Sequence, residues 1–141
     1  MQLILLVDDS RLLRMATHKV LEKAGFSVVT ATDGEEAVRM AGGRLPDLII
    51  LDMLLPKLGG PDVLRALKGS LLTAHIPVIV LSSLSQKNEV KLKTVGAVAY
   101  IEKSKLDLEK DGESLIAIVK GVLSDVAQPV VNNLFPPCSA S

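Results

Sequence analysis

The chain has 141 residues, of which 48% are hydrophobic, and its mean hydropathy is +0.38. This length fits one domain with a full hydrophobic core, so disulfides or a structural metal are not needed for folding. Sixteen lysines and arginines balance sixteen aspartates and glutamates, which excludes a protein that binds nucleic acid or an anionic membrane through its overall charge.

The single cysteine, Cys138, excludes an internal disulfide framework and suits a reducing cytoplasm. The N-terminal stretch MQLILLV has no basic region before it and runs directly into two aspartates, which is typical of a first strand and not of a signal peptide. No apolar run approaches the ~20 residues that span a bilayer. We therefore expect a soluble, cytoplasmic protein without membrane contact.

Short apolar runs alternate with amphipathic segments along the chain, which indicates a repeated strand–helix pattern. The pattern predicts five strands, at residues 2–7, 27–31, 47–51, 78–81 and 99–102. Several of these runs are continuously apolar, as strands covered on both faces are, and this favours a parallel sheet.

Helix signals fill the gaps between these strands. Ser10 is expected to cap the first helix and Gly25 to end it, while Asp33 caps the second helix and the glycine pair 42–43 ends it. Three further helices are predicted to begin near Gly60, near Ser85 and at Glu113, the last running to residue 127.

These elements predict an α/β fold with a doubly wound, five-stranded parallel sheet and five helices. We assign residues 1–127 to this domain and residues 128–141, which contain proline and no charge, to a tail or the start of a linker. In such folds the crossovers are right-handed and ligands bind at the carboxyl ends of the strands.

Polar side chains stand where the predicted strands end. Asp8 and Asp9 follow the first strand, Asp52 the third, Ser82 the fourth and Lys103 the fifth. Carboxylates are the ligands that Mg²⁺ prefers, and hydroxyl and ammonium groups bind phosphoryl oxygens. The sequence therefore predicts a site for Mg²⁺ and phosphate at this edge of the sheet.

At these residues the chain resembles the receiver domain of two-component response regulators, over residues 1 to about 125. LLVDDS resembles the acidic-pair motif, LIILDMLLP the phosphoacceptor strand and loop, VIVLSS the hydroxyl-bearing fourth strand, and AYIEKS the lysine motif. The resemblance implies a flavodoxin-like sheet with strand order 2-1-3-4-5. It also implies a signalling protein that binds a downstream partner, as chemotaxis-type single-domain receivers do, unless the chain is part of a longer protein.

The resemblance also implies roles for individual residues. Asp52 would accept a phosphoryl group from a sensor histidine kinase or a histidine phosphotransfer protein. Ser82 would contact the phosphoryl oxygens and Lys103 would pair with them, and Ser82 and Tyr100 would act as switch residues. Such a protein is not an enzyme for a separate substrate, because it catalyses only its own phosphorylation and dephosphorylation.

The chemistry of the residues supports a metal at this site. Three converging carboxylates repel one another unless a cation neutralises them, and Mg²⁺ takes oxygen ligands while keeping some of its waters. The expected direct ligands are Asp9, Asp52 and the backbone carbonyl of Leu54, with Asp8 acting through water. Asp52 is then the nucleophile.

The chain departs from the family pattern at a few positions. Ser104 follows Lys103 where receivers commonly have a proline. Leu54 and Leu84, each two positions after a site residue, offer no hydrogen bond to an attacking water, which predicts slow self-dephosphorylation.

Two alternative functions remain open. One is a metal-dependent phosphohydrolase or phosphotransferase with Asp52 as its nucleophile, resembling the haloacid-dehalogenase type, although that type has a second aspartate where this chain has Leu54. The other is a binding module that never takes phosphate.

The last predicted helix is apolar around more of its circumference than one core-facing stripe needs. We expect the surplus, near Ile118 and the face of the fourth helix, to contact a second copy of the chain, another partner, or the tail around residues 134–135.

Overall fold

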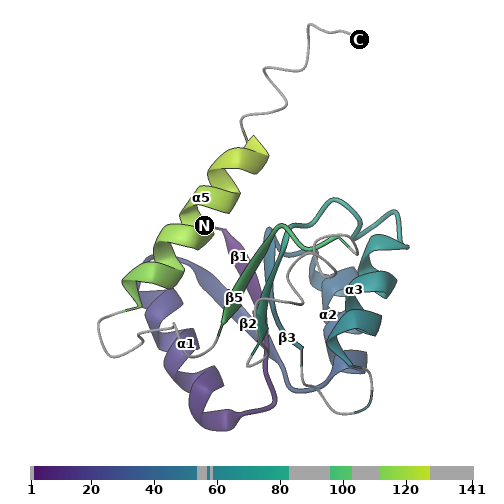
Figure 1. The fold of residues 1–141 in the computed structure, drawn as a ribbon, viewed down its shortest axis with the longest axis horizontal. Helices are drawn as coiled ribbons and strands as arrows, with labels where there is room; N and C mark the ends of the chain where they lie inside the picture. The colour runs from purple at the N-terminus through teal and green to yellow at the C-terminus, as the bar shows by residue number, and fades with distance from the viewer. Residues whose placement is uncertain (1, 54–56, 58, 83–95, 103–111, 128–141) are drawn as a thin grey trace, which may run out of the picture.

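The computed structural model of the chain describes residues 2–53, 57, 59–82, 96–102 and 112–127. Five parallel strands form one sheet in the order β2-β1-β3-β4-β5 (Figure 1). The strands are β1 (Leu3–Val7), β2 (Ser27–Ala31), β3 (Leu48–Asp52), β4 (Val78–Ser82) and β5 (Ala99–Glu102). The helices in the described ranges are α1 (Arg11–Lys23), α2 (Gly34–Arg44), α3 (Gly60–Lys68) and α5 (Glu113–Ala127).

The predicted flavodoxin-like sheet, with strand order 2-1-3-4-5, is confirmed. The described residues contain four helices, and the fifth that we predicted, which would begin near Ser85, lies outside them. The division of the chain at residue 127 stays a prediction.

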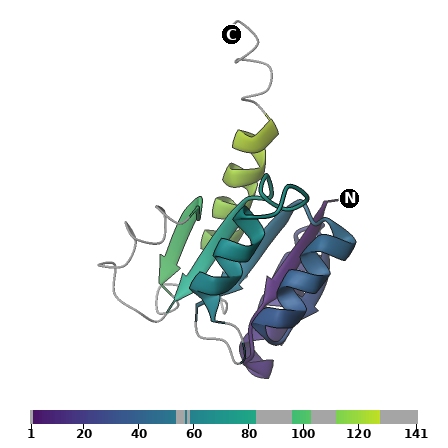
Figure 2. The ribbon, with the colours of Figure 1, turned by 90° about the vertical axis from the view of Figure 1, so that its right-hand side faces the viewer.

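Helices cover both faces of the sheet, α2 and α3 on one side and α1 and α5 on the other (Figures 1 and 2). Alternate residues of β3 point to opposite layers. Ile49 and Leu51 pack in one buried cluster with residues of α2 and α3, whereas Leu48 and Ile50 pack in a second cluster with residues of α1 and α5. This alternation explains the continuously apolar strands, because each face must fill a core.

The predicted helix caps at Ser10 and Asp33 are confirmed. The Ser10 hydroxyl accepts a hydrogen bond from the Leu13 amide at 3.4 Å, and the Asp33 carboxylate accepts one from the Glu36 amide at 2.8 Å. Gly25 ends the turn after α1 with φ of 101°, a conformation that glycine adopts without steric cost.

The prediction that the glycine pair 42–43 ends the second helix was wrong. α2 continues through both glycines to Arg44 and ends at Leu45, which adopts φ of 47° while its amide bonds to the Ala41 carbonyl at 3.0 Å. Pro46 sets this end, because a proline disfavours helical geometry in the residue before it. The next proline therefore decided the helix boundary, against the helix propensity of the two glycines.

Two strands extend one residue further than predicted, since Asp52 is the last residue of β3 and Ser82 the last of β4. Asp47, which we placed at the start of the third strand, lies before β3 and accepts a hydrogen bond from the Leu3 amide at 2.8 Å. The backbones of Asp52 and Ser82 are thus held within the hydrogen-bonded sheet and not in a loop.

The helix α5 spans the predicted residues. Leu115, Val119 and Leu123 are buried, and the flanking apolar residues Ile116, Ile118 and Val122 are half-buried against the same cluster. The core thus covers these flanking residues only in part, and the contact surface that we predicted there stays a prediction. None of the helices in the described ranges is long and apolar enough to cross a membrane.

Candidate functional site

The register of the sheet brings two aspartates to the same edge. Val7 of β1 pairs with Leu51 of β3, so the next residues, Asp8 and Asp52, are neighbours at the carboxyl ends of their strands. In a parallel sheet this relation depends only on register. The prediction that polar residues meet at this edge is confirmed for these two carboxylates.

Asp9 joins them from the turn between β1 and α1. One carboxylate oxygen from each of Asp8, Asp9 and Asp52 lies within 4.8 Å of the others. Asp8 and Asp52 are each only 1% exposed, whereas Asp9 faces solvent. Two buried carboxylates beside a third carry a desolvation cost and mutual repulsion, which a bound cation would offset.

The geometry of this cluster fits Mg²⁺. Oxygen ligands lie 2.0–2.1 Å from Mg²⁺ in an octahedron, which puts opposite ligands about 4.2 Å apart. The three carboxylate oxygens lie within 4.8 Å of one another, so a small closure, or bridging by the ion's own waters, would let one ion bind all three. The donor set consists of hard oxygen ligands, which suit Mg²⁺ better than they suit softer metals.

The turn that carries Asp8 and Asp9 is held at several points. The Asp8 amide donates to the Ala31 carbonyl at 3.1 Å, and the Asp8 side chain accepts from the Ser10 amide at 2.9 Å. Arg14, one turn into α1, donates from Nη1 to the Asp8 carbonyl at 3.0 Å. We did not predict this role of Arg14, since sequence spacing alone does not show that its side chain folds back over the turn.

The backbone after Asp52 is held equally closely. The Met53 amide donates to the Leu81 carbonyl at 3.1 Å, and the Gly60 amide at the start of α3 donates to the Met53 carbonyl at 3.1 Å. A Cβ at Gly60 would lie 2.6 Å from the Met53 Cα. Only glycine therefore permits α3 to begin this close to the residue after Asp52. The glycine pair before Pro61 was the sequence feature that could have indicated this close contact between α3 and Met53.

A second unpredicted contact joins two loops at this edge. Lys57, from the segment between β3 and α3, lies 3.6 Å from the Asp33 carboxylate that caps α2, measured from its ammonium nitrogen. The Glu36 amide, followed by the Lys57 charge, lowers the pKa of Asp33 from its usual value. Lys57 also adopts φ of 65°, which is uncommon for a residue with a side chain.

The structure describes only some of the remaining predicted site residues. The backbone of Ser82 ends β4 directly after Leu81, which pairs with Asp52. Tyr100 of β5 pairs with Val80 and is half-buried against the cluster that α2 and α3 cover. The predicted residues that lie outside the described part of the chain are Leu54, Leu84, Lys103 and Ser104.

Comparisons with known proteins show which family the chain resembles. The family model of the response regulator receiver domain matches residues 4–110. The gliding motility regulatory protein of Myxococcus xanthus is 41% identical over 107 residues, which are 75% of this chain and 14% of that protein. The alkaline phosphatase synthesis transcriptional regulatory protein PhoP of Bacillus subtilis is 36% identical over 129 residues, which are 89% of this chain and 51% of PhoP. This chain thus spans about half the length of PhoP and a smaller share of the gliding motility regulatory protein.

Solved structures show the same fold. The receiver domain of a signal transduction histidine kinase from Syntrophus aciditrophicus has a TM-score of 0.79 and 34% identity, covering 91% of this chain and 94% of that one. A CheY-like receiver domain protein from Methanospirillum hungatei has a TM-score of 0.80 and 26% identity, covering 92% of this chain and 98% of that one. The fold, the carboxylate cluster and the family match agree, and the chain belongs to the response regulator receiver domain family.

Proposed function

We propose that this chain is a phosphorylation-activated receiver in which Asp52 accepts a phosphoryl group from a histidine kinase or a histidine phosphotransfer protein. One observation carries the proposal: two buried carboxylates and one exposed carboxylate converge at the carboxyl edge of a parallel sheet, with Asp52 at the end of a central strand. This is where open α/β sheets bind ligands.

Each residue of the cluster has a proposed part in the transfer. An Asp52 carboxylate oxygen attacks the phosphorus atom while the bond from phosphorus to the donor's imidazole nitrogen breaks. Asp8 and Asp9 hold Mg²⁺, which when bound neutralises the carboxylates and the phosphoryl oxygens. Ser82 and Lys103 bind the phosphoryl oxygens, and Leu54 gives its backbone carbonyl to the metal.

The signal would leave the site through a change in the partner-binding face, with Ser82 and Tyr100 as switch residues. Tyr100 is suited to this part because it is half-buried and contacts the core beneath α2 and α3, so a change in its rotamer has to repack that layer. The downstream partner is a protein, in the cytoplasm, and a second copy of the chain at the face of the fourth and fifth helices is one candidate.

The proposal can be tested with beryllium fluoride, an analogue of the phosphoryl group. In the presence of Mg²⁺, it should shift the amide signals of Asp8, Asp9 and Met53 in the wild type, and the shifts should extend to Tyr100. Asp52→Asn should abolish all of them. Asp47→Asn is the matched control, since it removes a carboxylate at the opposite edge of the sheet yet keeps an oxygen for the Leu3 amide. Equal shifts in wild type and Asp52→Asn would contradict the proposal.

A further inference from the structure

Three large apolar side chains lie exposed where β4 and β5 begin, at the edge of the sheet opposite the carboxylate cluster. Leu71 and Leu72, in the turn between α3 and β4, are 97% and 60% exposed, and Val98, just before β5, is 48% exposed. We call these three residues the amino-edge patch, because they lie where β4 and β5 begin.

Lys68 joins the two segments that carry this patch. Its ammonium donates to the carbonyls of Ala74 at 3.1 Å and Ile76 at 2.8 Å, which belong to the turn that bears both leucines. Its aliphatic stem lies against Gly96, where an added Cβ would be 2.9 Å from the Lys68 Cγ. Both segments therefore pack on one side chain.

Exposed leucines in adjacent positions, on a fixed backbone, indicate a surface that another apolar group covers. The turn is fixed by more than Lys68. The buried Thr73 hydroxyl donates to the Leu67 carbonyl at 2.6 Å, and the Val98 amide donates to the Val78 carbonyl at 2.9 Å. The patch is thus held in place before any partner arrives, which lowers the entropic cost of binding.

The chain itself supplies a suitable occupant. Residues 128–141 follow α5, carry no charge and contain the apolar residues Val130, Val131, Leu134 and Phe135. Figures 1 and 2 both place the carboxyl end of α5 at the same end of the molecule as the turn between α3 and β4. This segment therefore begins at the edge of the sheet that bears the patch.

The length of this segment matches the distance to be crossed. α5 and α3 lie on opposite faces of the sheet, and two packed layers of secondary structure separate their axes by roughly 20 Å. Leu134 is seven positions beyond Ala127, and seven extended residues span about 23 Å. We propose that Leu134 and Phe135 dock on the amino-edge patch, with residues 128–133 crossing the amino edge of the sheet.

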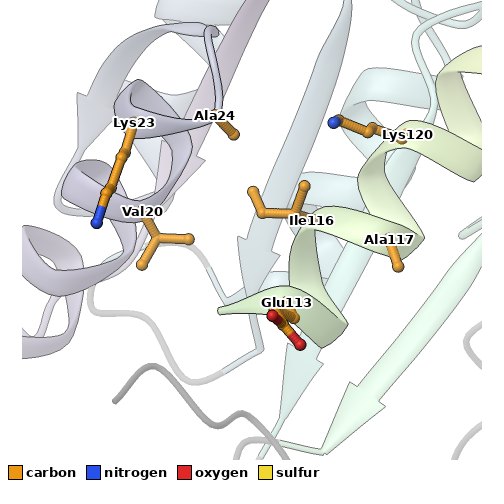
Figure 3. Close-up of a pocket in the computed structure, with 7 residues that line it drawn as sticks. All are labelled: Val20, Lys23, Ala24, Glu113, Ile116, Ala117 and Lys120. Atoms are coloured by element: carbon orange, nitrogen blue, oxygen red, sulfur yellow. The ribbon is translucent and has the colours of Figure 1, made fainter. Parts of the chain in front are cut away.

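One other apolar surface lies near α5, a groove of about 410 Å³ between α1 and α5 (Figure 3). Val20 and Ile116 face each other across it, and Lys23 and Lys120 stand at its rims. To reach it, the segment after Ala127 would have to reverse direction and run back along α5. An uncharged segment also gains nothing from the two lysines, so the amino-edge patch is the better fit.

Cys138, the only cysteine, lies three positions beyond Phe135 and allows a direct test on the full chain. A nitroxide attached to Cys138 should reduce the amide signals of Leu71, Leu72 and Val98 and leave those of Val20 and Ile116 at full intensity. The double variant Leu134→Ser/Phe135→Ser should restore the lost signals. Leu12→Ser, which changes a leucine on α1 that is 83% exposed, is the matched control and should leave the loss intact.

Three outcomes would overturn the proposal. The first is a loss of signal at Val20 and Ile116 instead of the patch, which would place the segment in the groove. The second is no loss at either place. The third concerns a mixture of two forms of the chain, one isotope-labelled without nitroxide and one carrying the nitroxide without isotope label. A loss of signal in that mixture would assign the contact to a second copy.

Discussion

The start of α3 provides a sharp test of how the site is built. In Gly60→Ala, the added Cβ would lie 2.6 Å from the Cα and the Cε of Met53 and 3.0 Å from its carbonyl oxygen. The Cε belongs to a flexible side chain and can move away, but the other two atoms are backbone. The helix must therefore shift from Met53, which stretches the 3.1 Å hydrogen bond from the Gly60 amide to the Met53 carbonyl.

Overpacking of this kind lowers the free energy of unfolding by about 1–3 kcal/mol. Urea unfolding measures it, and the melting temperature should fall by several degrees for a chain of this size. Because Met53 follows Asp52 directly, the variant should also lose part of the stabilisation that Mg²⁺ gives.

Gly43→Ala is the matched control. Gly43 lies within α2 with nothing within 4 Å of an added Cβ, so this substitution should stabilise the protein by about 0.5–1 kcal/mol. If Gly60→Ala were as stable as Gly43→Ala and bound Mg²⁺ as the wild type does, the close approach of α3 to Met53 would not constrain the site.

Three further predictions concern the residues around the site. Asp9→Asn should abolish the stabilisation by Mg²⁺, which in the wild type reaches about 2.7 kcal/mol when the Mg²⁺ concentration is a hundred times Kd. An equal rise in melting temperature for both proteins would count against the cluster as the metal site. Arg14→Ala should cost about 1–2 kcal/mol in urea unfolding and weaken Mg²⁺ binding, since the Asp8 carbonyl loses its charged donor; an effect on stability alone would show that Arg14 does not position Asp8. The lowered pKa of Asp33 means that its contribution to stability is complete above its unfolded pKa of about 3.9 and is lost as pH falls through the folded value. Asp33→Asn should therefore flatten the acid side of the stability curve, and an unchanged slope there would refute this origin.

The parts of the fold that follow from local chemistry could be predicted. Ser10 and Asp33 each stand directly before a helix, where their side chains can accept hydrogen bonds from the first backbone amides. Their caps were therefore evident in the sequence. The meeting of two carboxylates followed from the same reasoning, because a parallel sheet brings the ends of its strands together whatever the loops do. Asp8 and Asp52 meet for that reason alone.

The features that were missed have one local and several tertiary origins. The end of α2 is set by Pro46, beyond two glycines that on their own favour an earlier end. The approach of Gly60 to Met53 and the reach of Lys57 to Asp33 depend on how α3 and α2 dock on the sheet. Sequence spacing does not determine such tertiary contacts.

Phosphorylation at Asp52 is the central claim, and intact-mass measurement tests it most directly. The wild type, incubated with Mg²⁺ and acetyl phosphate, should gain the mass of one phosphoryl group, and chelating the Mg²⁺ should prevent the gain. Asp52→Asn should gain nothing, while Asp47→Asn should behave as the wild type does. A wild type that stays unmodified, or an adduct that persists in Asp52→Asn, would contradict the account.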